Sequence, residues 1–286
     1  MLKKITQFCG RLIKTFIPYH QCKSLQYNTA IVAIIKNEGD YIEEWVKYHR
    51  LIGVDHIYLY NNGSTDDTKT ILEPYVHENF VTLIDFPGVG RQLPAYNDAL
   101  KNYGKLCKYM AFIDADEFLY PIERKSVTEV LDEIIAKNTH AGGVAVNWRI
   151  YGSSGHVTKP NGGVLSNFLW RAKEDGTGNR CIKTIVQPQY VYTYAHVHYP
   201  TYLIGRYSID ENGERVDGWN HKMLEIKKIR INHYYTKSKE EWIKRRSMGK
   251  ADSNNPEANK RTLDEFYQHD NNDIYDESML YYVNKL

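Results

Sequence analysis

Residues 29–60 read TAIVAIIKNEGDYIEEWVKYHRLIGVDHIYLY, and this stretch predicts the fold. Residues 29–35 are apolar and mostly branched, without alternation, which is typical of a strand buried on both faces. Apolar residues then recur at helical spacing over 41–52, and Gly53 ends the predicted helix. A second strand is predicted at 56–60. A strand, a helix and a strand in this order predict a parallel sheet with helices packed on it.

The same alternation continues toward the middle of the chain. The next predicted elements are a helix at 65–75, a strand at 80–85, a helix at 94–103 and a strand at 109–113. We therefore expect an α/β fold with a mostly parallel, Rossmann-like sheet and helices on both faces. Beyond about residue 140, long polar loops separate strands predicted at 144–148 and 182–187. Such loops often bind ligands, so we expect this loop-rich half to form the acceptor side of a site.

Composition narrows the class of protein. The chain has 286 residues, 42% of them hydrophobic, and a net charge of only +2, so no global field indicates a nucleic-acid partner. No stretch has the roughly 18 apolar residues that a membrane-spanning helix needs. Four widely spaced cysteines form no metal or redox motif, which favours a reducing compartment. We therefore expect a cytoplasmic protein.

The first 17 residues show a second kind of pattern. On a helical wheel the apolar side chains gather on one face and the basic ones on the other. The apolar set is Leu2, Ile5, Phe8, Leu12, Ile13 and Phe16, and the basic set is Lys3, Lys4, Arg11 and Lys14. This amphipathic segment predicts contact with the inner surface of the cell membrane, or a helix that docks on the body of the protein itself.

Residues 110–120 read MAFIDADEFLY, and they carry a candidate metal site. An apolar run typical of a buried strand leads to Asp114 and Asp116. Side chains at positions i and i+2 of a strand point the same way, so the two carboxylates would converge if the chain stays extended past Ile113. Such oxygen ligands suit Mg²⁺ or Mn²⁺, with phosphate oxygens completing the shell. The alternative is a polar strand end or a cap for the next helix.

Position strengthens the metal interpretation. In parallel sheets, ligands bind beyond the carboxyl ends of the strands. The polar loops that follow the predicted strands are residues 36–39, 61–66, 85–91 and 114–117. All four loops are expected at the same edge of the sheet, so Asp114 and Asp116 should face a shared ligand site.

Four strings together resemble a known family. They are residues 30–68, ending in NNGSTDDT, then FIDADEFLYP at 112–121, RCIKTIVQP at 180–188 and INHYYTKSKEEW at 231–242. Between residues 29 and 270 the chain resembles glycosyltransferases of the GT-A fold. It is most similar to the family 92-like branch, also called the domain of unknown function 23 group, which is related to family 2.

The resemblance implies a domain organisation. Residues 1–27 would be the amphipathic segment and a linker, and residues 28–286 a single GT-A domain. Within that domain, residues 28–122 would form the nucleotide-sugar half and residues 123–286 the acceptor half.

The resemblance also implies a nucleotide-sugar site. Asn37 and Glu38 correspond to the loop that holds the nucleoside, and Asp66 to the nucleotide-proximal turn. Family 2 usually has two aspartates where this chain has Asn61 and Asn62, so the base preference is open, although an Asn carbonyl can still accept a hydrogen bond from uracil or guanine. The segment before the metal strand supplies Arg91, Gln92 and Asn97. Arg91 could equally be a solvated loop cation.

Metal and phosphate ligands follow from the same resemblance. Asp114 and Asp116 match the metal-binding Asp-x-Asp, where Mn²⁺ or Mg²⁺ neutralises the leaving diphosphate. His233 is the first candidate for a further contact, ahead of His196 and His198; its alternative is a core hydrogen-bonding histidine. Cations that could pair with phosphate oxygens are Arg180, Lys183, Lys237, Lys244 and Arg245. For Lys244 a solvated helix face is the favoured reading.

The resemblance implies transfer with inversion, which requires a carboxylate to accept the proton of the acceptor hydroxyl. The candidates are Glu174 and Asp175, in the loop RAKEDGTGN, and Glu117 beside the aspartate pair. The glycines of that loop would allow it to close over the sugar, although Glu-Asp-Gly is also an ordinary turn sequence. The expected donor is a nucleotide sugar, UDP-linked, and the expected acceptor a glycan or lipid-linked glycan in surface polysaccharide or lipopolysaccharide synthesis.

Two other classes compete with this interpretation. A sugar-phosphate nucleotidyltransferase would share the sheet, metal and nucleotide, but it usually has a glycine-rich basic loop after the first strand, whereas residues 36–39 read KNEG. A non-catalytic sugar-binding or membrane-scaffold protein on the same fold is the third possibility. The intact Asp114 and Asp116 argue against a transferase fold that has lost its catalytic residues.

Overall fold

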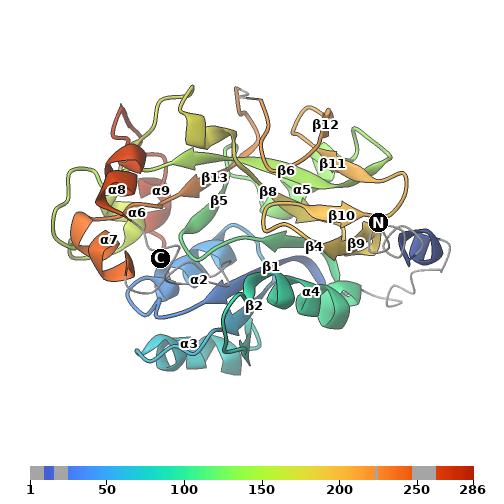
Figure 1. Cartoon of the computed structure of the whole chain (residues 1–286), viewed down its shortest axis with the longest axis horizontal. Helices are drawn as coiled ribbons and strands as arrows, with labels where there is room; N and C mark the ends of the chain where they lie inside the picture. Colours follow the sequence, from blue (N-terminus) through green and yellow to red (C-terminus); the bar gives the residue numbers. More distant parts are fainter. Residues whose placement is uncertain (1–9, 16–24, 223–224, 247–261) are drawn as a thin grey trace.

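The computed structural model describes residues 10–15, 25–222, 225–246 and 262–286, and a ten-stranded sheet forms its centre (Figure 1). The order of strands along the sheet is β12-β11-β6-β8-β4-β1-β2-β3, and β13 pairs with β6 and β5. These strands are β1 (Tyr27–Ile35), β2 (His56–Asn61), β3 (Val81–Asp85), β4 (Cys107–Phe112), β5 (Glu117–Pro121), β6 (Ala141–Ile150), β8 (Ile182–Val186), β11 (Tyr207–Ile209), β12 (Arg215–Val216) and β13 (Ile229–His233).

Helices and two small sheets surround the centre. The helices are α2 (Ile42–Leu51), α3 (Thr68–His77), α4 (Gln92–Tyr103), α5 (Val127–Ile135), α6 (Val164–Asn167), α7 (Lys239–Arg246), α8 (Leu263–His269) and α9 (Leu280–Val283). One small sheet pairs β9 (Val191–Tyr194) with β10 (Pro200–Tyr202), and the other pairs β7 (Trp170–Arg171) with β14 (Ile274–Tyr275). Short 3-10 turns are η1 (Gly104–Leu106), η2 (Thr177–Arg180) and η3 (Pro188–Tyr190).

Most strands of the central sheet run in one direction. β1 is parallel to β2 and β4, and β2 is parallel to β3. β8 is antiparallel to both β4 and β6, so β4 and β6 share a direction, and β11 and β13 are parallel to β6. The expected α/β class with a mostly parallel sheet is therefore confirmed. Because β8 lies between β4 and β6, one sheet runs through both halves of the chain.

Helices cover both faces of the sheet, as the unbroken apolar run of β1 predicts. Ile31, Ala33 and Ile35 point to one face and pack with apolar residues of α2, α3 and α5. Ala30 and Val32 point to the other face and pack with α4. Alternate residues of one strand thus serve two separate cores, which explains why residues 30–35 include no polar side chain.

The helices predicted in the first half are present, with shifted boundaries. α3 begins at Thr68, three residues later than expected. The shift has a local cause, because the Asp66 carboxylate accepts hydrogen bonds from the Thr68 backbone N–H (3.2 Å) and hydroxyl (2.6 Å) and so holds residues 66–68 in a turn before the helix. α4 begins at Gln92, two residues earlier than expected. The strands predicted around 144–148 and 182–187 correspond to β6 and β8.

The amphipathic segment predicted at residues 1–17 lies largely outside the described residues. Residues 10–15 form a short helix at the end of the molecule away from α7 and α8 (Figure 1). Arg11 donates to the carbonyl of Tyr202, and Lys14 to the carbonyl of Tyr192 at 3.2 Å. This part of the segment therefore docks on the protein itself, while membrane contact stays a prediction. In the part of the chain that the structure describes, no helix is long and apolar enough to cross a membrane.

Candidate functional site

Charged side chains meet at the carboxyl edge of the parallel strands. Asp114 lies two residues beyond the end of β4, and Lys183 is the second residue of β8, which runs the opposite way and so begins at this same edge. His233 ends β13, next to the end of β6. The edge predicted from the loop positions therefore carries Asp114, and Lys183 and His233, which the resemblance implied, lie at the same edge.

Asp114 is held by contacts on both carboxylate oxygens. The Gln92 amide donates to Oδ1 at 2.8 Å, and Lys183 Nζ lies 2.9 Å from Oδ2. The backbone N–H of Asp114 donates to Glu117 Oε2 at 2.9 Å. The Asp114 side chain is 35% exposed, so it remains open to a ligand while its orientation is fixed.

The condition for Asp114 and Asp116 to share one face of an extended strand is not met. β4 ends at Phe112, and a turn follows in which the Glu117 N–H donates to the Asp114 carbonyl at 3.0 Å. The reason is topological. β5 is antiparallel to β13 and therefore runs opposite to β4, so the chain must reverse between the two strands. As a result the two aspartates have different partners.

Asp116 binds cations from the C-terminal part of the chain. Its Oδ2 lies 2.9 Å from Arg245 of α7, and its Oδ1 lies 3.4 Å from Nε2 of His233. Burial alone would raise the pKa of Asp116, but Arg245 and then His233 outweigh it and hold the pKa well below the usual range. Asp116 is therefore an anion at neutral pH, although its side chain is only 8% exposed.

Glu117 occupies the interior next to this pair. Its side chain is fully buried, and Lys183 lies 3.8 Å from its Oε2. Burial raises the pKa of Glu117 well above the usual value, with Lys183 opposing the shift and Asp114 adding to it. A carboxyl enclosed in this way cannot contact an acceptor hydroxyl, so the structure corrects the prediction that Glu117 is a catalytic base. It positions Asp114 and Lys183 instead.

Glu38 lies in the same electrostatic neighbourhood. Burial raises its pKa, Lys237 and Arg245 oppose the shift, and Asp116 adds to it. Lys237 is 3% exposed, and its ammonium group lies 4.4 Å from the centre of the Tyr41 ring. Lys237 and Arg245, both predicted as phosphate partners, thus face Glu38 and Asp116 at this edge. Lys244 is exposed, as its favoured reading predicted.

The loops after β1 and β2 fasten to each other. The Asn37 backbone N–H donates to Ser64 Oγ at 2.9 Å, and Asn37 Oδ1 accepts from the Thr65 N–H at 2.8 Å. Asp66 Oδ2 accepts from the Gly39 N–H at 3.0 Å. Burial opposes the shift, but the hydrogen bonds from Thr68 and Gly39 hold the pKa of Asp66 below its usual value. Asn37 and Asp66 therefore shape this loop pair.

Asn62 takes no part in the hydrogen bonds given above between these two loops. Its Oδ1 is buried and accepts no hydrogen bond from the described residues. A buried acceptor without a donor costs free energy of about 1–3 kcal/mol, so this oxygen marks a position where a ligand N–H would be favoured.

The three residues predicted from the segment before β4 have different surroundings. Gln92 is 6% exposed and orients Asp114, as described above. The Arg91 guanidinium stacks on the Phe86 ring at 3.9 Å, and its buried Nε has no hydrogen-bond partner among the described residues. The amide of Asn97 donates to the Tyr194 carbonyl at 2.8 Å and accepts from the Tyr194 N–H at 2.9 Å. Asn97 also accepts a hydrogen bond from the Thr193 hydroxyl. Its side-chain amide therefore joins α4 to β9, whereas the prediction directed it toward the diphosphate or sugar.

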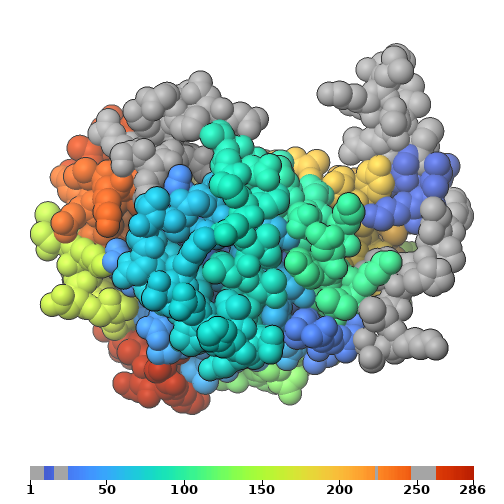
Figure 2. All heavy atoms as spheres, turned by 90° about the horizontal axis from the view of Figure 1, so that it is seen from below, coloured from blue at the N-terminus to red at the C-terminus, as the bar shows by residue number. Residues whose placement is uncertain are grey.

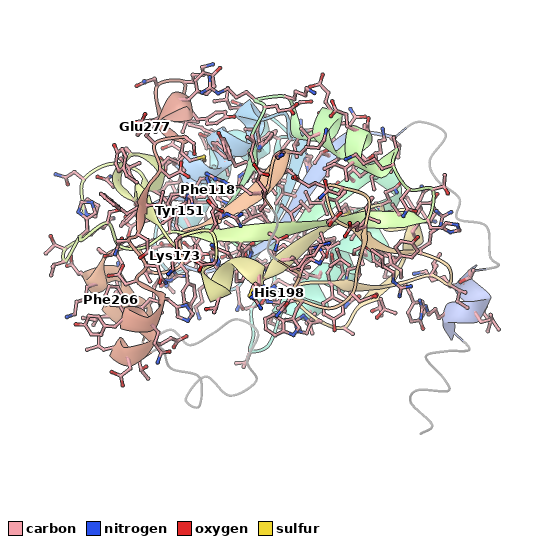
Figure 3. All side chains as sticks on the ribbon, turned by 90° about the horizontal axis from the view of Figure 1, so that it is seen from above. Phe118, Tyr151, Lys173, His198, Phe266 and Glu277 are labelled. Carbon is pink, nitrogen blue, oxygen red and sulfur yellow. The ribbon has the colours of Figure 1, made fainter. Side chains whose placement is uncertain are left out.

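The two remaining candidate bases lie in the loop before β8, whose neighbour Lys173 is labelled in Figure 3. Glu174 forms ion pairs of 2.8 Å with Arg149 and Arg171. Arg149 alternates with Trp148 on β6, so it lies on the sheet face opposite the one that carries Trp148 and His233. Glu174 is therefore held away from the aspartates. Asp175 is 66% exposed, with Lys173 at 3.8 Å.

Aromatic and imidazole rings complete the edge. Trp148 lies between His233, at 4.3 Å between ring centres, and His198, at 5.2 Å. Trp148 Nε1 and His233 Nδ1 are both buried without a hydrogen-bond partner among the described residues. Burial, with Lys183 adding to it, lowers the pKa of His198 to about 4. Sequence reasoning missed Trp148, which is marked only by its place two residues before the end of a long strand.

Aromatic side chains pack together behind this edge. Phe118 and Tyr151, both labelled in Figure 3, contact the ring of Tyr234 at 5.4 and 4.6 Å between ring centres. The N–H of Tyr234 donates to the carbonyl of Asp116 at 2.9 Å. Packing of β5 and β13 therefore fixes the backbone from which Asp116 projects.

The metal ligands predicted from the sequence can be compared with the side chains at this edge. Within the described residues, no three His, Cys, Asp or Glu side chains are grouped closely enough to enclose a metal ion. Mg²⁺ is usually bound by one or two carboxylates together with substrate phosphates and water, not by a complete protein cage. Asp114 and Asp116 are carboxylates of this kind, so their chemistry suits an ion that arrives with a diphosphate. With His233 they form no metal-binding group among the described residues, and metal binding here stays a prediction.

Comparison with known proteins decides the family. The sequence profile described as glycosyltransferase family 92 matches residues 32–270. The chain belongs to glycosyltransferase family 92. The resemblance seen in the four sequence strings is thereby confirmed.

Individual relatives are more distant. A family 92 protein from Ricinus communis is 25% identical over 146 residues, which cover 51% of this chain and 26% of that protein. Galactan beta-1,4-galactosyltransferase GALS2 from Arabidopsis thaliana is 32% identical over 100 residues, or 32% of this chain and 19% of that protein. The matches thus span about a quarter or less of these relatives.

A solved structure shows a weak likeness. S. aureus TarS, residues 1–349 in complex with UDP, has a TM-score of 0.37 and 14% identity, with 56% of this chain and 47% of that chain covered. The fold of this family 92 chain therefore rests on its own strand order and packing.

Proposed function

We propose that this glycosyltransferase moves a hexosyl group from a UDP-linked sugar to a glycan or lipid-linked glycan, with inversion and with the help of Mn²⁺ or Mg²⁺. The observation that carries the proposal is the pairing of two aspartates with separate cations at one edge of the sheet. Asp114 holds Lys183, and Asp116 holds Arg245 and His233. An edge with this balance of charge can receive a diphosphate, because carboxylates bind its metal and cations bind its oxygens.

The nucleoside end has its own support. Asn62 Oδ1 is a buried acceptor without a donor among the described residues, and it lies in the same loop as Asp66, which is hydrogen-bonded to the loop of Asn37. The N–H of a uracil ring would satisfy this oxygen. Arg91, stacked on Phe86 in the next loop, has N–H groups to offer the same ligand.

The reaction forms a bond between the acceptor oxygen and the anomeric carbon and breaks the bond from that carbon to the diphosphate oxygen. The acceptor proton passes to a carboxylate, and the nucleoside diphosphate leaves with its negative charge. A bound metal would neutralise part of that charge through Asp114 and Asp116. Lys183 beside Asp114 and Arg245 beside Asp116 are the cations proposed for the rest. Asp175 is the proposed base, because Glu117 is enclosed and Glu174 is held by two arginines.

The biological setting is part of the proposal. The acceptor would belong to a surface polysaccharide or lipopolysaccharide, and the protein would work at the inner surface of the cell membrane. The basic amphipathic start of the chain supports this location, because such segments bind anionic membrane surfaces.

A donor screen tests the proposal. The full chain is incubated with UDP-galactose, UDP-glucose or UDP-N-acetylglucosamine and an acceptor glycan, with Mn²⁺ or with EDTA, and nucleoside diphosphate release is measured. UDP-galactose comes first because relatives are named as galactosyltransferases. We expect metal-dependent release of UDP and an inverted product by NMR. Release of pyrophosphate, or no metal-dependent nucleotide binding, would overturn the proposal.

A further inference from the structure

A pocket on the β11–β12 side of the sheet contains a group of arginines. Its volume is about 170 Å³, and it forms where β10, β11 and β12 meet. The side chains that matter are three arginines and three tyrosines: Arg11, Arg206, Arg215, Tyr199, Tyr202 and Tyr207. Asp217 is the acidic residue of the lining, so the cations outnumber the acids. We call this feature the arginine pocket.

The arginine pocket is remote from the aspartate edge. Tyr207 of β11 is paired with Ala141, the first residue of β6, whereas His233 is paired with Ile150, the last. β6 has ten residues, so its two ends are about 30 Å apart at roughly 3.3 Å per residue. A ligand in the arginine pocket would therefore not touch the site proposed for sugar transfer.

Protein contacts hold the three arginines in place but engage only some of their N–H donors. Arg11 donates to the Tyr202 carbonyl, and Arg215 pairs with Asp217 at 2.9 Å. Arg206 donates to the Thr139 carbonyl and stacks on the Tyr190 ring at 3.8 Å. Each guanidinium has five N–H donors, and these contacts use only some of them. The remainder suits an anion with several oxygens, such as a phosphate.

Exposed apolar side chains adjoin the arginine pocket. Leu12 is 39% exposed, Ile13 is 60% exposed and Ile204 is 40% exposed. The Ile204 N–H donates to Thr15 Oγ1 at 3.2 Å, which joins the 203–206 turn to the helix at residues 10–15. Figure 2 shows this helix (dark blue) against the segment around β9 and β10 (yellow) at one end of the molecule. Cations and exposed apolar side chains thus share one surface.

We propose that this surface binds a bilayer containing anionic phospholipids, with a headgroup phosphate in the arginine pocket and Leu12, Ile13 and Ile204 at the boundary of the acyl chains. The combination carries the inference. Cations attract the negative surface, and exposed apolar side chains gain by leaving water, whereas a soluble phosphate would use only the cations. The inference deepens the membrane setting of the proposed function and places the aspartate edge about 30 Å from the contact.

Vesicle sedimentation of the full chain, without nucleotide or acceptor, tests this surface. We compare phosphatidylcholine vesicles with vesicles that contain one third phosphatidylglycerol. We expect binding to the anionic vesicles only, and a loss of about fivefold for each cation removed, so that Arg206→Gln with Arg215→Gln lowers binding more than tenfold. Ile13→Ser with Ile204→Ser should also lower it.

A matched control separates the pocket from general charge. Arg124 stacks on the Tyr281 ring at 3.8 Å, as Arg206 does on Tyr190, but it does not line the arginine pocket. Arg124→Gln should therefore keep most of the binding. Equal binding by wild type and the Arg206→Gln/Arg215→Gln variant would overturn the proposal, as would equal binding to neutral and anionic vesicles. Binding of millimolar inorganic phosphate to the pocket, without any binding of the protein to vesicles, would show a soluble-anion site and would also overturn the proposal.

The outcome is independent of the sugar-transfer proposal. Vesicle binding requires no donor, and nucleoside diphosphate release on a soluble acceptor should be unchanged in both arginine variants. If release is absent from every protein while vesicle binding follows the arginines, only the proposed reaction fails. If release is present while the arginine variants bind vesicles normally, only the membrane surface fails.

Discussion

Asp116 Oδ2 lies 2.9 Å from the guanidinium of Arg245, which joins a turn after the fourth strand to a helix 129 residues later in the chain. The pair is enclosed, with 8% of the Asp116 side chain and 18% of the Arg245 side chain exposed. Ion pairs in such surroundings contribute less to net stability than to the position of the charges, because desolvation offsets much of their attraction. The pair fixes an anion and a cation where a metal diphosphate is proposed to bind.

Asp116→Asn should lower nucleoside diphosphate release by roughly 100-fold or more, because the neutral side chain no longer binds a metal or holds Arg245. It should also lower the free energy of unfolding by roughly 3 kcal/mol, because a buried cation loses its partner. Urea unfolding measures the second effect.

The double variant Asp116→Asn with Arg245→Met separates stability from activity. Removing both charges should restore most of the unfolding free energy, since no unpaired charge stays buried, and activity should remain low. Recovered stability together with recovered activity would show that neither charge takes part in transfer.

Lys183→Met should lower the free energy of unfolding more than the loss of an exposed lysine on the neighbouring strand does. Lys183 is 1% exposed and serves both Asp114 and Glu117, so its loss should cost roughly 3 kcal/mol of unfolding free energy. Lys108 of β4 also pairs with a carboxylate, Asp132, at 2.8 Å, but is 37% exposed, so Lys108→Met should cost under about 1 kcal/mol.

The contribution of Lys183 to the free energy of unfolding should depend on pH with a definite sign. Burial lowers the pKa of Lys183, but Asp114 and Glu117 outweigh it and raise the pKa well above 10.5. The stabilisation is therefore complete below pH 10.5 and is lost only as pH rises further. A deficit of Lys183→Met that grows between pH 6 and 9 would contradict this assignment.

The sequence predicts the frame of the site better than its contacts. β1 and β4 are recognisable because residues 30–35 and 109–112 form unbroken apolar or aromatic runs, as strands buried on both faces do, and the edge follows from their direction. The partner of Asp116 is not predictable in this way. It depends on β5 reversing the chain and pairing with β13, and those are contacts between segments more than 100 residues apart.

Asn97 illustrates the limit from the other side. Its type and its place before the metal strand matched a sugar-binding residue, yet α4 turns the side chain toward β9. The helix register, set by the packing of Ala95, Tyr96 and Ala99 on the sheet, decides this direction. Local sequence reveals the amide and not its orientation.

Asn97→Ala and Asn62→Ala should therefore have opposite signatures. Asn97→Ala removes several hydrogen bonds between α4 and β9 and should lower the unfolding free energy by roughly 2 kcal/mol with little change in KM for the donor. Asn62→Ala removes an unpaired buried acceptor, so it should leave stability nearly unchanged or raise it, while raising KM for a UDP-sugar several-fold. Urea unfolding and steady-state kinetics distinguish the two, and the reverse pattern would reinstate Asn97 as the donor contact.

His49 should make the fold sensitive to mild acid. It is fully buried on α2, with Nδ1 2.8 Å from the Trp45 carbonyl and Nε2 3.3 Å from the Leu119 N–H. The ring is therefore assigned as neutral, with the proton on Nδ1, and a second proton on Nε2 would oppose the Leu119 N–H. Burial lowers the pKa of His49 to about 3, from a usual value of 6.5.

The unfolded chain therefore takes up a proton below pH 6.5 that the native state does not. Stability should fall by about 1.4 kcal/mol for each pH unit between pH 6 and 4 from His49 alone. His49→Gln has no such proton to bind, so urea unfolding at pH 7, 6, 5 and 4 should give a shallower slope for the variant, even though it starts from a lower stability because its packing between Trp45 and Phe118 is altered. Parallel slopes for the two proteins would mean that His49 is protonated in the native state, and its hydrogen bond from Leu119 would then have to be absent.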